Sequence, residues 1–192
     1  SRACAALVEK GPVPADHPVR WFPAAIFPDR ELRILPYNRL VKDLLGRTPE
    51  AFLAEVKKSF HVGPAATAEP ERKGEIRMFL SGRWYTLTPK EPVPVDDPIR
   101  SLDVSILQDR LLAPLLGIAD PRTDKRIDFV GGIRGTAELE KRVSSGECAA
   151  AFSMYPTTIA ELMAIADAGE TMPPKSTWFE PKLRSGLFVH RF

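Results

Sequence analysis

Apolar residues recur at helical spacing in two segments of this chain. The first covers 48–63, where Thr48 is a suitable N-cap and Pro49 occupies the first helical position. The second covers 102–116 and carries a stripe of isoleucine and leucine, which a proline near its end is expected to kink or stop. Both segments are therefore predicted to be helices that pack on a core.

Alternating apolar and polar positions predict β-hairpins in the first half of the chain. The clearest joins strands over 75–80 and 83–88 through Ser81-Gly82, a two-residue glycine-containing loop typical of tight turns. The other elements predicted there are a helix over 2–10, a hairpin of strands over 21–27 and 31–35, and a loop or short strand over 36–40.

The second half alternates between strand-like and helix-like segments. The predicted order is a strand over 127–130, a helix over 136–143, a strand over 148–154, a helix over 158–168 and a final strand over 187–192. A strand–helix–strand–helix order favours parallel pairing. The predicted fold class is therefore α/β or α+β, with a mixed sheet, a βαβα unit in the C-terminal half and β-hairpins in the N-terminal half.

A polar stretch divides the chain into two candidate regions. We expect an N-terminal subdomain over 1–63, a linker over 64–73 and a C-terminal α/β region over 74–192. The chain begins with Ser1 and shows no secretory leader. It is therefore expected to be the C-terminal part of a longer protein.

Composition narrows the functional class. Hydrophobic residues make up 44% of the 192 residues and charged residues 27%, which indicates a globular chain, and no apolar run reaches the length of a membrane span. A net charge of +2 is too small to favour nucleic acid as a partner. Cys4 and Cys148 match no zinc or redox spacing, so both are expected to be free thiols in a cytoplasmic protein.

The strongest candidate for a binding site is the stretch over 171–186. Two prolines rigidify it, and it gathers cations and hydroxyls beside Trp178 and Phe179, as an anionic ligand requires. Its candidate ligand-binding residues are Lys175, Ser176, Thr177, Lys182 and Arg184. The alternative is structural: the aromatic residues close a sheet, and the charges form a solvated face.

A second charged cluster lies over 120–128. Its candidate ligand-binding residues are Arg122, Lys125 and Arg126, and Asp124 is the candidate general base. A cluster of mixed sign more often forms surface ion pairs, which is the favoured interpretation here. No set of residues has the spacing of a metal site.

Two other segments are weaker candidates for ligand binding. Asn38 and Arg39 are polar residues between apolar segments; a turn role is favoured over ligand contact. The glycine-rich turn over 131–136 precedes a predicted helix and could bind phosphate, but its spacing matches neither common nucleotide motif. A tight turn between strand and helix is therefore the favoured role.

Three strings of the sequence resemble one family. They are LRILPYNRLVKDL, SLDVSILQDRLLAPLLGIADPRTDKRIDFVGGIRG and MPPKSTWFEPKLRSGL. They are similar to a bacterial and archaeal family catalogued as domain of unknown function 1015. Members of that family carry an upstream Asp-Gly-His-His-Arg segment, which this chain lacks. The segment resembles the nucleotide- and phosphate-binding motif of the ParB-like and sulfiredoxin-like fold, some of whose relatives are kinases of free serine.

The resemblance implies part of a phosphate- or nucleotide-binding site, and at the level of fold analogy a phosphotransferase. The sequence identifies no cofactor; a nucleotide with magnesium is what the resemblance implies. The expected partner is a small anionic molecule or a nucleotide, with no membrane partner. Two alternatives stay open: a regulatory module that senses a metabolite, and a ParB-like protein that binds nucleic acid.

Overall fold

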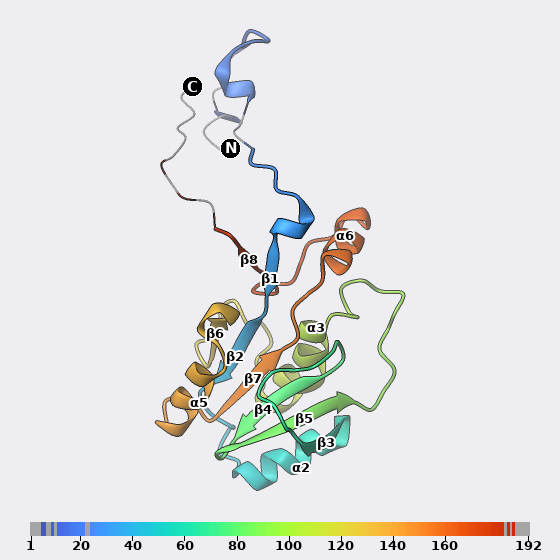
Figure 1. Cartoon of the computed structure of the whole chain (residues 1–192), viewed down its shortest axis with the longest axis vertical. Coiled ribbons are helices and arrows are strands. Elements are labelled where there is room, and N and C mark those ends of the chain that lie inside the picture. Colours follow the sequence, from blue (N-terminus) through green and yellow to red (C-terminus); the bar gives the residue numbers. More distant parts are fainter. Residues whose placement is uncertain are drawn as a thin grey trace. The chain divides into compact units, whose positions relative to one another are not determined.

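The computed structural model describes residues 5–6, 9, 11–21, 24–182, 184 and 186, which fall into two compact units. One unit comprises 1–33 and 181–192, and the other comprises 34–180. The larger unit holds the six-stranded sheet and the helices that pack on it (Figure 1). No helix in these described ranges is long and apolar enough to cross a membrane.

One prediction for the start of the chain is wrong. Within the smaller unit the described residues include two short 3-10 helices, η1 (Pro18–Arg20) and η2 (Asp29–Glu31). Residues 24–28 form no strand, so the hairpin predicted over 21–35 is wrong, and β1 (Arg33–Leu35) pairs with β8 (Trp178–Glu180) instead. The predicted strand over 187–192 and most of the predicted helix over 2–10 lie outside the described residues.

The larger unit is built on a six-stranded sheet in the order β3-β5-β4-β7-β2-β6 (Figure 1). Its strands are β2 (Tyr37–Val41), β3 (Phe60–Pro64), β4 (Ile76–Leu80), β5 (Arg83–Pro89), β6 (Ile127–Gly131) and β7 (Ala150–Met154). Its helices and turns of helix are α2 (Pro49–Ser59), α3 (Asp103–Leu107), η3 (Gln108–Leu112), α4 (Ala113–Leu116), η4 (Gly132–Arg134), α5 (Ala137–Ser144) and α6 (Ile159–Asp167). The predicted α+β class is confirmed.

Local sequence signals place several of these elements. Thr48 accepts a hydrogen bond from the Ala51 backbone N–H and caps α2. Ser81 and Gly82 have φ values of 49° and 75°, the left-handed pair that a two-residue hairpin turn between β4 and β5 requires. The predicted capping box of Thr158 and Glu161 opens α6.

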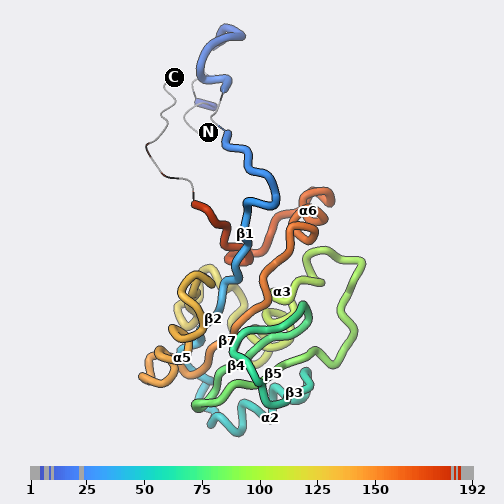
Figure 2. Tube along the Cα trace, viewed as in Figure 1, coloured from blue at the N-terminus to red at the C-terminus, as the bar shows by residue number. Residues whose placement is uncertain are grey.

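The predicted parallel pairing is wrong. β6 and β7 do not pair with each other, because β2 lies between them and is antiparallel to both. Figure 2 shows the trace of β2 beside that of β7. All five described ladders of the six-stranded sheet are antiparallel. The inserted strand is the segment that the sequence favoured as a loop or short strand.

Two hydrophobic clusters hold this unit together, one on each face of the sheet. On one face, residues such as Met78 and Phe152 pack with α2 and with the helical run from α3 to α4. On the other face, Leu40 and Phe79 pack with Leu139 of α5. Because successive strand residues point to opposite faces, Arg39 lies on the face of the larger cluster.

Candidate functional site

A cavity of about 400 Å³ opens beside the edge of the sheet in the larger unit. Its walls come from β2, β6, the helical run over 103–116, the loop after that run, and two prolines of the 171–186 stretch. Most of the lining is apolar, and includes Ile99, Val104, Leu112, Phe129, Pro173 and Pro174. A cavity of this size and character suits a small organic ligand.

Arg39 is the buried charged residue among those that line the cavity. It is only 4% exposed, and its guanidinium donates to the Tyr37 carbonyl and, at 3.1 Å, to the Lys175 carbonyl. The guanidinium also lies 5.7 Å from the centre of the Phe129 ring, within the range of a cation–π interaction. Two carbonyl dipoles and one aromatic ring therefore surround a buried positive charge.

No carboxylate forms an ion pair with Arg39 among the described residues. Burial lowers the pKa of Arg39 to about 9, and this value leaves the group cationic at neutral pH. Charges in protein interiors are ordinarily paired or bound to ions. Arg39 is therefore a buried cation at the wall of a cavity, without a carboxylate partner in the part of the chain that the structure describes.

The sheet register places Arg39 there. Arg39 lies opposite Phe129 in β6 and opposite Phe152 in β7, so all three side chains share one face. Phe152 is fully buried, whereas Phe129 lies at the edge and lines the cavity. The position of β2 between β6 and β7 therefore sets both the burial of Arg39 and its direction.

The helical wall of the cavity contains a π-helical turn, η3, between α3 and α4. Gln108 and Leu112 of this turn line the cavity, and the Gln108 side-chain amide donates to the Ile118 carbonyl at 2.6 Å. Single π turns inside α-helices occur frequently at functional sites. Here the turn widens the helix where it borders the cavity.

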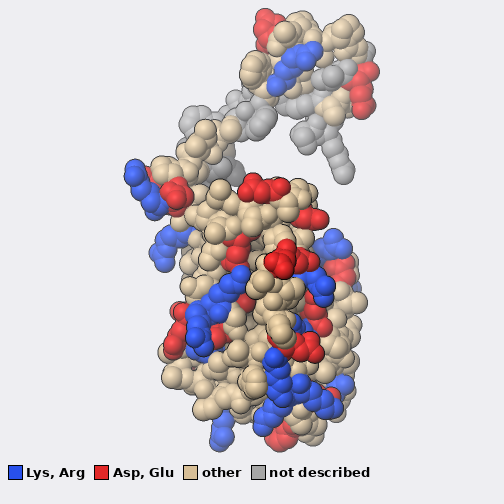
Figure 3. All heavy atoms as spheres, turned by 90° about the vertical axis from the view of Figure 1, so that its right-hand side faces the viewer, with Lys and Arg blue, Asp and Glu red and all other residues tan. Residues whose placement is uncertain are grey.

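The charges at the rim are largely neutralised. Arg122 lines the cavity but forms an ion pair with Asp120 at 2.9 Å, and the hydrogen bond from Arg122 lowers the pKa of that carboxyl. Arg100 and Asp109 are exposed and also line the cavity. Figure 3 shows the same mixing of positive and negative side chains over one face of the molecule.

Residues 173–176 form a tight turn against Arg39. Pro174 and Lys175 occupy the turn, and Lys175 has a φ of 56°; a proline followed by a positive φ is the pattern of a type II turn. The Ser176 hydroxyl donates to the Pro173 carbonyl, and the Ser176 carbonyl accepts from Thr157 at 3.3 Å. We call residues 173–176 the clasp, because its backbone contacts the guanidinium of Arg39.

The structure places the predicted binding residues of the 171–186 stretch in different surroundings. Lys175 is exposed, with its ammonium group 5.3 Å from the centre of the Tyr37 ring, while Ser176 is 3% exposed and Thr177 is half-buried. Lys182 and Arg184 are exposed and belong to the smaller unit. The prolines and the Lys175 carbonyl are the parts of the stretch that meet the cavity or Arg39.

In the second predicted cluster, Arg122 is the residue that lines the cavity. Asp124 and Arg126 form an ion pair at 2.7 Å, and this hydrogen bond lowers the pKa of Asp124, which makes it a weaker base. Lys125 is exposed. Asn38 is buried, and its side-chain oxygen accepts from the Met154 backbone N–H at 3.1 Å, so it extends the contact between β2 and β7.

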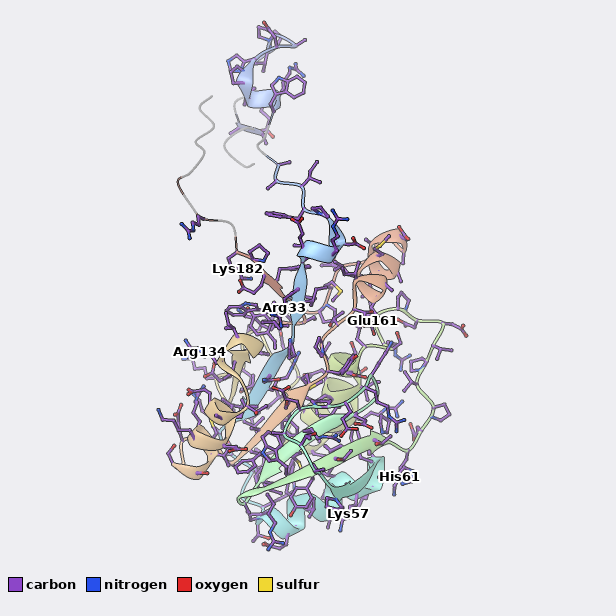
Figure 4. All side chains as sticks on the ribbon, in the orientation of Figure 1. Arg33, Lys57, His61, Arg134, Glu161 and Lys182 are labelled. Atoms are coloured by element: carbon purple, nitrogen blue, oxygen red, sulfur yellow. The ribbon has the colours of Figure 1, made fainter. Side chains whose placement is uncertain are left out.

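The glycine-rich turn is explained by close packing. A β-carbon on Gly131 would meet the Trp178 ring at 2.4 Å, and one on Gly132 would meet Pro36 at 2.7 Å. Arg134 follows in η4 and is exposed (Figure 4). The geometry of these glycines fits the structural role that the sequence favoured.

Sequence reasoning missed a second buried titratable group, at the N-terminal end of the helical run that lines the cavity. Asp103 opens α3, is 8% exposed, and accepts the Gly74 N–H at 3.0 and 3.1 Å. Burial raises the pKa of Asp103 to about 6. Nearby, Glu161 of α6 (Figure 4) forms an ion pair with Lys73 at 2.6 Å. Only tertiary packing brings these groups together, so no local sequence signal indicates them.

Comparison with known proteins identifies the family. Residues 1–105, more than half of the chain, match the family described as "Protein of unknown function (DUF1015)", and the chain belongs to this family. No curated protein matches the chain significantly.

Distant similarity to solved structures is also found. One is a free serine kinase in complex with AMP, with a TM-score of 0.44 and 16% identity over 78% of this chain and 54% of the kinase. Another is a conserved hypothetical protein from Pyrococcus furiosus, with a TM-score of 0.45 and 18% identity over 79% of this chain and 57% of that chain. The chain thus spans little more than half the length of these structures.

Proposed function

We propose that the larger unit binds a small molecule through an anionic group, with phosphate as the favoured group. The observation that carries this proposal is Arg39, a buried guanidinium without a carboxylate partner among the described residues, at the wall of a cavity of about 400 Å³. Its planar fork of donors matches the oxygens of a phosphate or carboxylate. The bound anion would supply the missing negative charge.

The apolar lining supports a ligand with an organic body. Phe129, Leu112 and Pro174 offer surface to a ring or an aliphatic group, while Arg39 fixes its charged end. The paired rim residues Arg122 and Asp120 add polarity with little net charge. A phosphate ester meets both requirements better than a free inorganic ion does.

A phosphotransferase role is a further step within this proposal. Phosphoryl transfer relies on positioning and charge stabilisation, which Arg39 could provide, with a nucleotide and magnesium as the implied cofactors. Asp124 stays the proposed base, but it does not line the cavity. Turnover of a nucleotide with magnesium by the protein would distinguish phosphotransfer from metabolite sensing, which predicts binding without turnover.

Binding of phenyl phosphate, measured by calorimetric titration, tests the anion site. Arg39→Met keeps an unbranched side chain but removes the charge, and should weaken binding by roughly 10- to 100-fold, since a charge-assisted hydrogen bond contributes about 1.5–3 kcal/mol. The matched control is Arg83→Met, at an exposed arginine that does not line the cavity. It should change the affinity by about threefold or less.

Thermal unfolding of both variants separates a binding effect from misfolding. Arg39→Met should melt near the wild-type temperature or above it, because an apolar group replaces a buried charge that has no carboxylate partner among the described residues. Benzyl alcohol, which lacks the anion, should bind both proteins equally weakly. Unchanged affinity of a folded Arg39→Met protein for phenyl phosphate would refute the proposed site.

A further inference from the structure

The clasp holds an unfavourable backbone conformation against the proposed anion site. Lys175 occupies the turn position that calls for glycine or asparagine, with a φ of 56°. A side chain with a β-carbon disfavours this left-handed region. The contacts that hold this turn are the hydrogen bond from Arg39 to the Lys175 carbonyl at 3.1 Å, the approach of the Lys175 ammonium group to the Tyr37 ring, and the hydrogen bond from the Ser176 hydroxyl to the Pro173 carbonyl.

The clasp covers part of the guanidinium that a ligand would contact. Arg39 donates one N–H of Nη1 to the Tyr37 carbonyl and one of Nη2 to the Lys175 carbonyl, and it is only 4% exposed beside a cavity that Pro173 and Pro174 also line. A charge-assisted hydrogen bond to a phosphate oxygen is stronger than one to a neutral carbonyl. Lys175 is exposed, so water can take the place of Arg39 on its carbonyl.

We propose that the clasp is an internal competitor for the anion site, which an anionic ligand displaces from Arg39. When Arg39 turns to the anion, the turn relaxes from type II to type I and Lys175 adopts a negative φ. Pro174 suits both turn types at its position. Because Pro173 and Pro174 line the cavity, the change also reshapes the wall that the ligand contacts.

The anchors on either side limit the change to the turn. Met172 packs against the larger core cluster before the clasp, and the Ser176 carbonyl accepts from Thr157 at its end. Trp178 then lies against Gly131. The residues that move are therefore those between Pro173 and Ser176.

This inference rests on the proposed function, and a pair of variants tests it separately. Lys175→Gly favours the left-handed turn, whereas Lys175→Ala keeps the β-carbon; both remove the ammonium group equally. With the clasp closed in the free protein, Lys175→Gly should bind phenyl phosphate roughly fivefold more weakly than Lys175→Ala. The backbone chemical shifts of Lys175 in the wild type should also move to those of a negative φ on saturation with phenyl phosphate.

The outcomes separate the two claims. If Arg39→Met loses affinity but the two Lys175 variants bind equally, or the Lys175 shifts stay those of a positive φ, the anion site stands and the clasp does not compete with it. If Arg39→Met keeps the wild-type affinity, the site itself is wrong. Weaker binding by Lys175→Gly than by Lys175→Ala, together with the change in shifts, supports the competition.

Discussion

The buried carboxylate of Asp103 makes a sharp prediction about stability and pH. Asp103 is 8% exposed and accepts a hydrogen bond from the Gly74 N–H, while Lys73, a cation that acts on it, is paired with Glu161. Burial raises the pKa of Asp103 from 3.8 to about 6; Glu161 also raises it, and Lys73 opposes the shift. Tyr155 completes the polar surroundings of this group.

The direction in which stability changes with pH follows from proton binding by Asp103. Between about pH 4 and pH 6 the folded protein holds the Asp103 proton more tightly than the unfolded chain, so this group makes the folded state less stable as pH rises through that window. Above pH 6 its contribution is constant. A shift of about two pKa units corresponds to roughly 3 kcal/mol, at 1.36 kcal/mol per unit.

Asp103→Asn removes the titration and keeps a side-chain oxygen for the Gly74 N–H. At pH 7 the variant should be more stable than the wild type by roughly 1–3 kcal/mol, the lower value allowing for a lost helix-dipole contribution. Near pH 4 the advantage should vanish. Urea unfolding at pH 4, 5, 6 and 7 measures the difference, with exposed Asp109→Asn as the control that should show no such trend.

A difference in the free energy of unfolding between Asp103→Asn and the wild type that is independent of pH would contradict the raised pKa of Asp103. A stability advantage of Asp103→Asn that grows as pH falls would contradict it as well. Either result would mean that the carboxylate is stabilised in the fold by contacts stronger than the Gly74 N–H.

Two further substitutions test the packing. Gly131→Ala should lower the free energy of unfolding by roughly 1–3 kcal/mol, because its β-carbon would meet the Trp178 ring at 2.4 Å, while Gly63→Ala, with open space around it, is the matched control in urea unfolding. Gly82→Val should cost roughly 1 kcal/mol or more through its φ of 75° and leave phenyl phosphate affinity unchanged. A wild-type melting temperature for Gly131→Ala, or lost affinity in a fully stable Gly82→Val protein, would contradict these assignments.

Local signals predicted the elements whose chemistry is contained in a few neighbouring residues. The cap at Thr48, the Ser81-Gly82 turn and the Thr158 capping box each act over three or four positions, and all three form in the structure. The helix over 102–116 was also predicted, although its π turn was not. These elements follow from periodicity and capping alone.

Sheet order could not be predicted in the same way. Strand β2 contains Asn38 and Arg39, polar residues that favour a turn in a local analysis, yet both are buried because β2 pairs with β6 and β7. That pairing joins segments about one hundred residues apart, so no nearby residue indicates it. The predicted parallel arrangement failed because this strand occupies the place between the two expected neighbours.

The candidate site was predicted in part. The 171–186 stretch and Arg122 were selected for their charge and rigidity, and both contribute to the cavity lining. Arg39 was selected as well, but with a turn role favoured, because its burial depends on strands distant in sequence. The missed Asp103 likewise owes its pKa to burial by segments far from it in the chain.

A crystal structure of the protein with phenyl phosphate tests the central claim most directly. We expect a phosphate oxygen about 2.7–2.9 Å from a guanidinium nitrogen of Arg39, with the phenyl ring against the apolar wall near Phe129. A phosphate bound elsewhere, with the cavity empty and the Arg39 guanidinium contacting only protein groups, would contradict it.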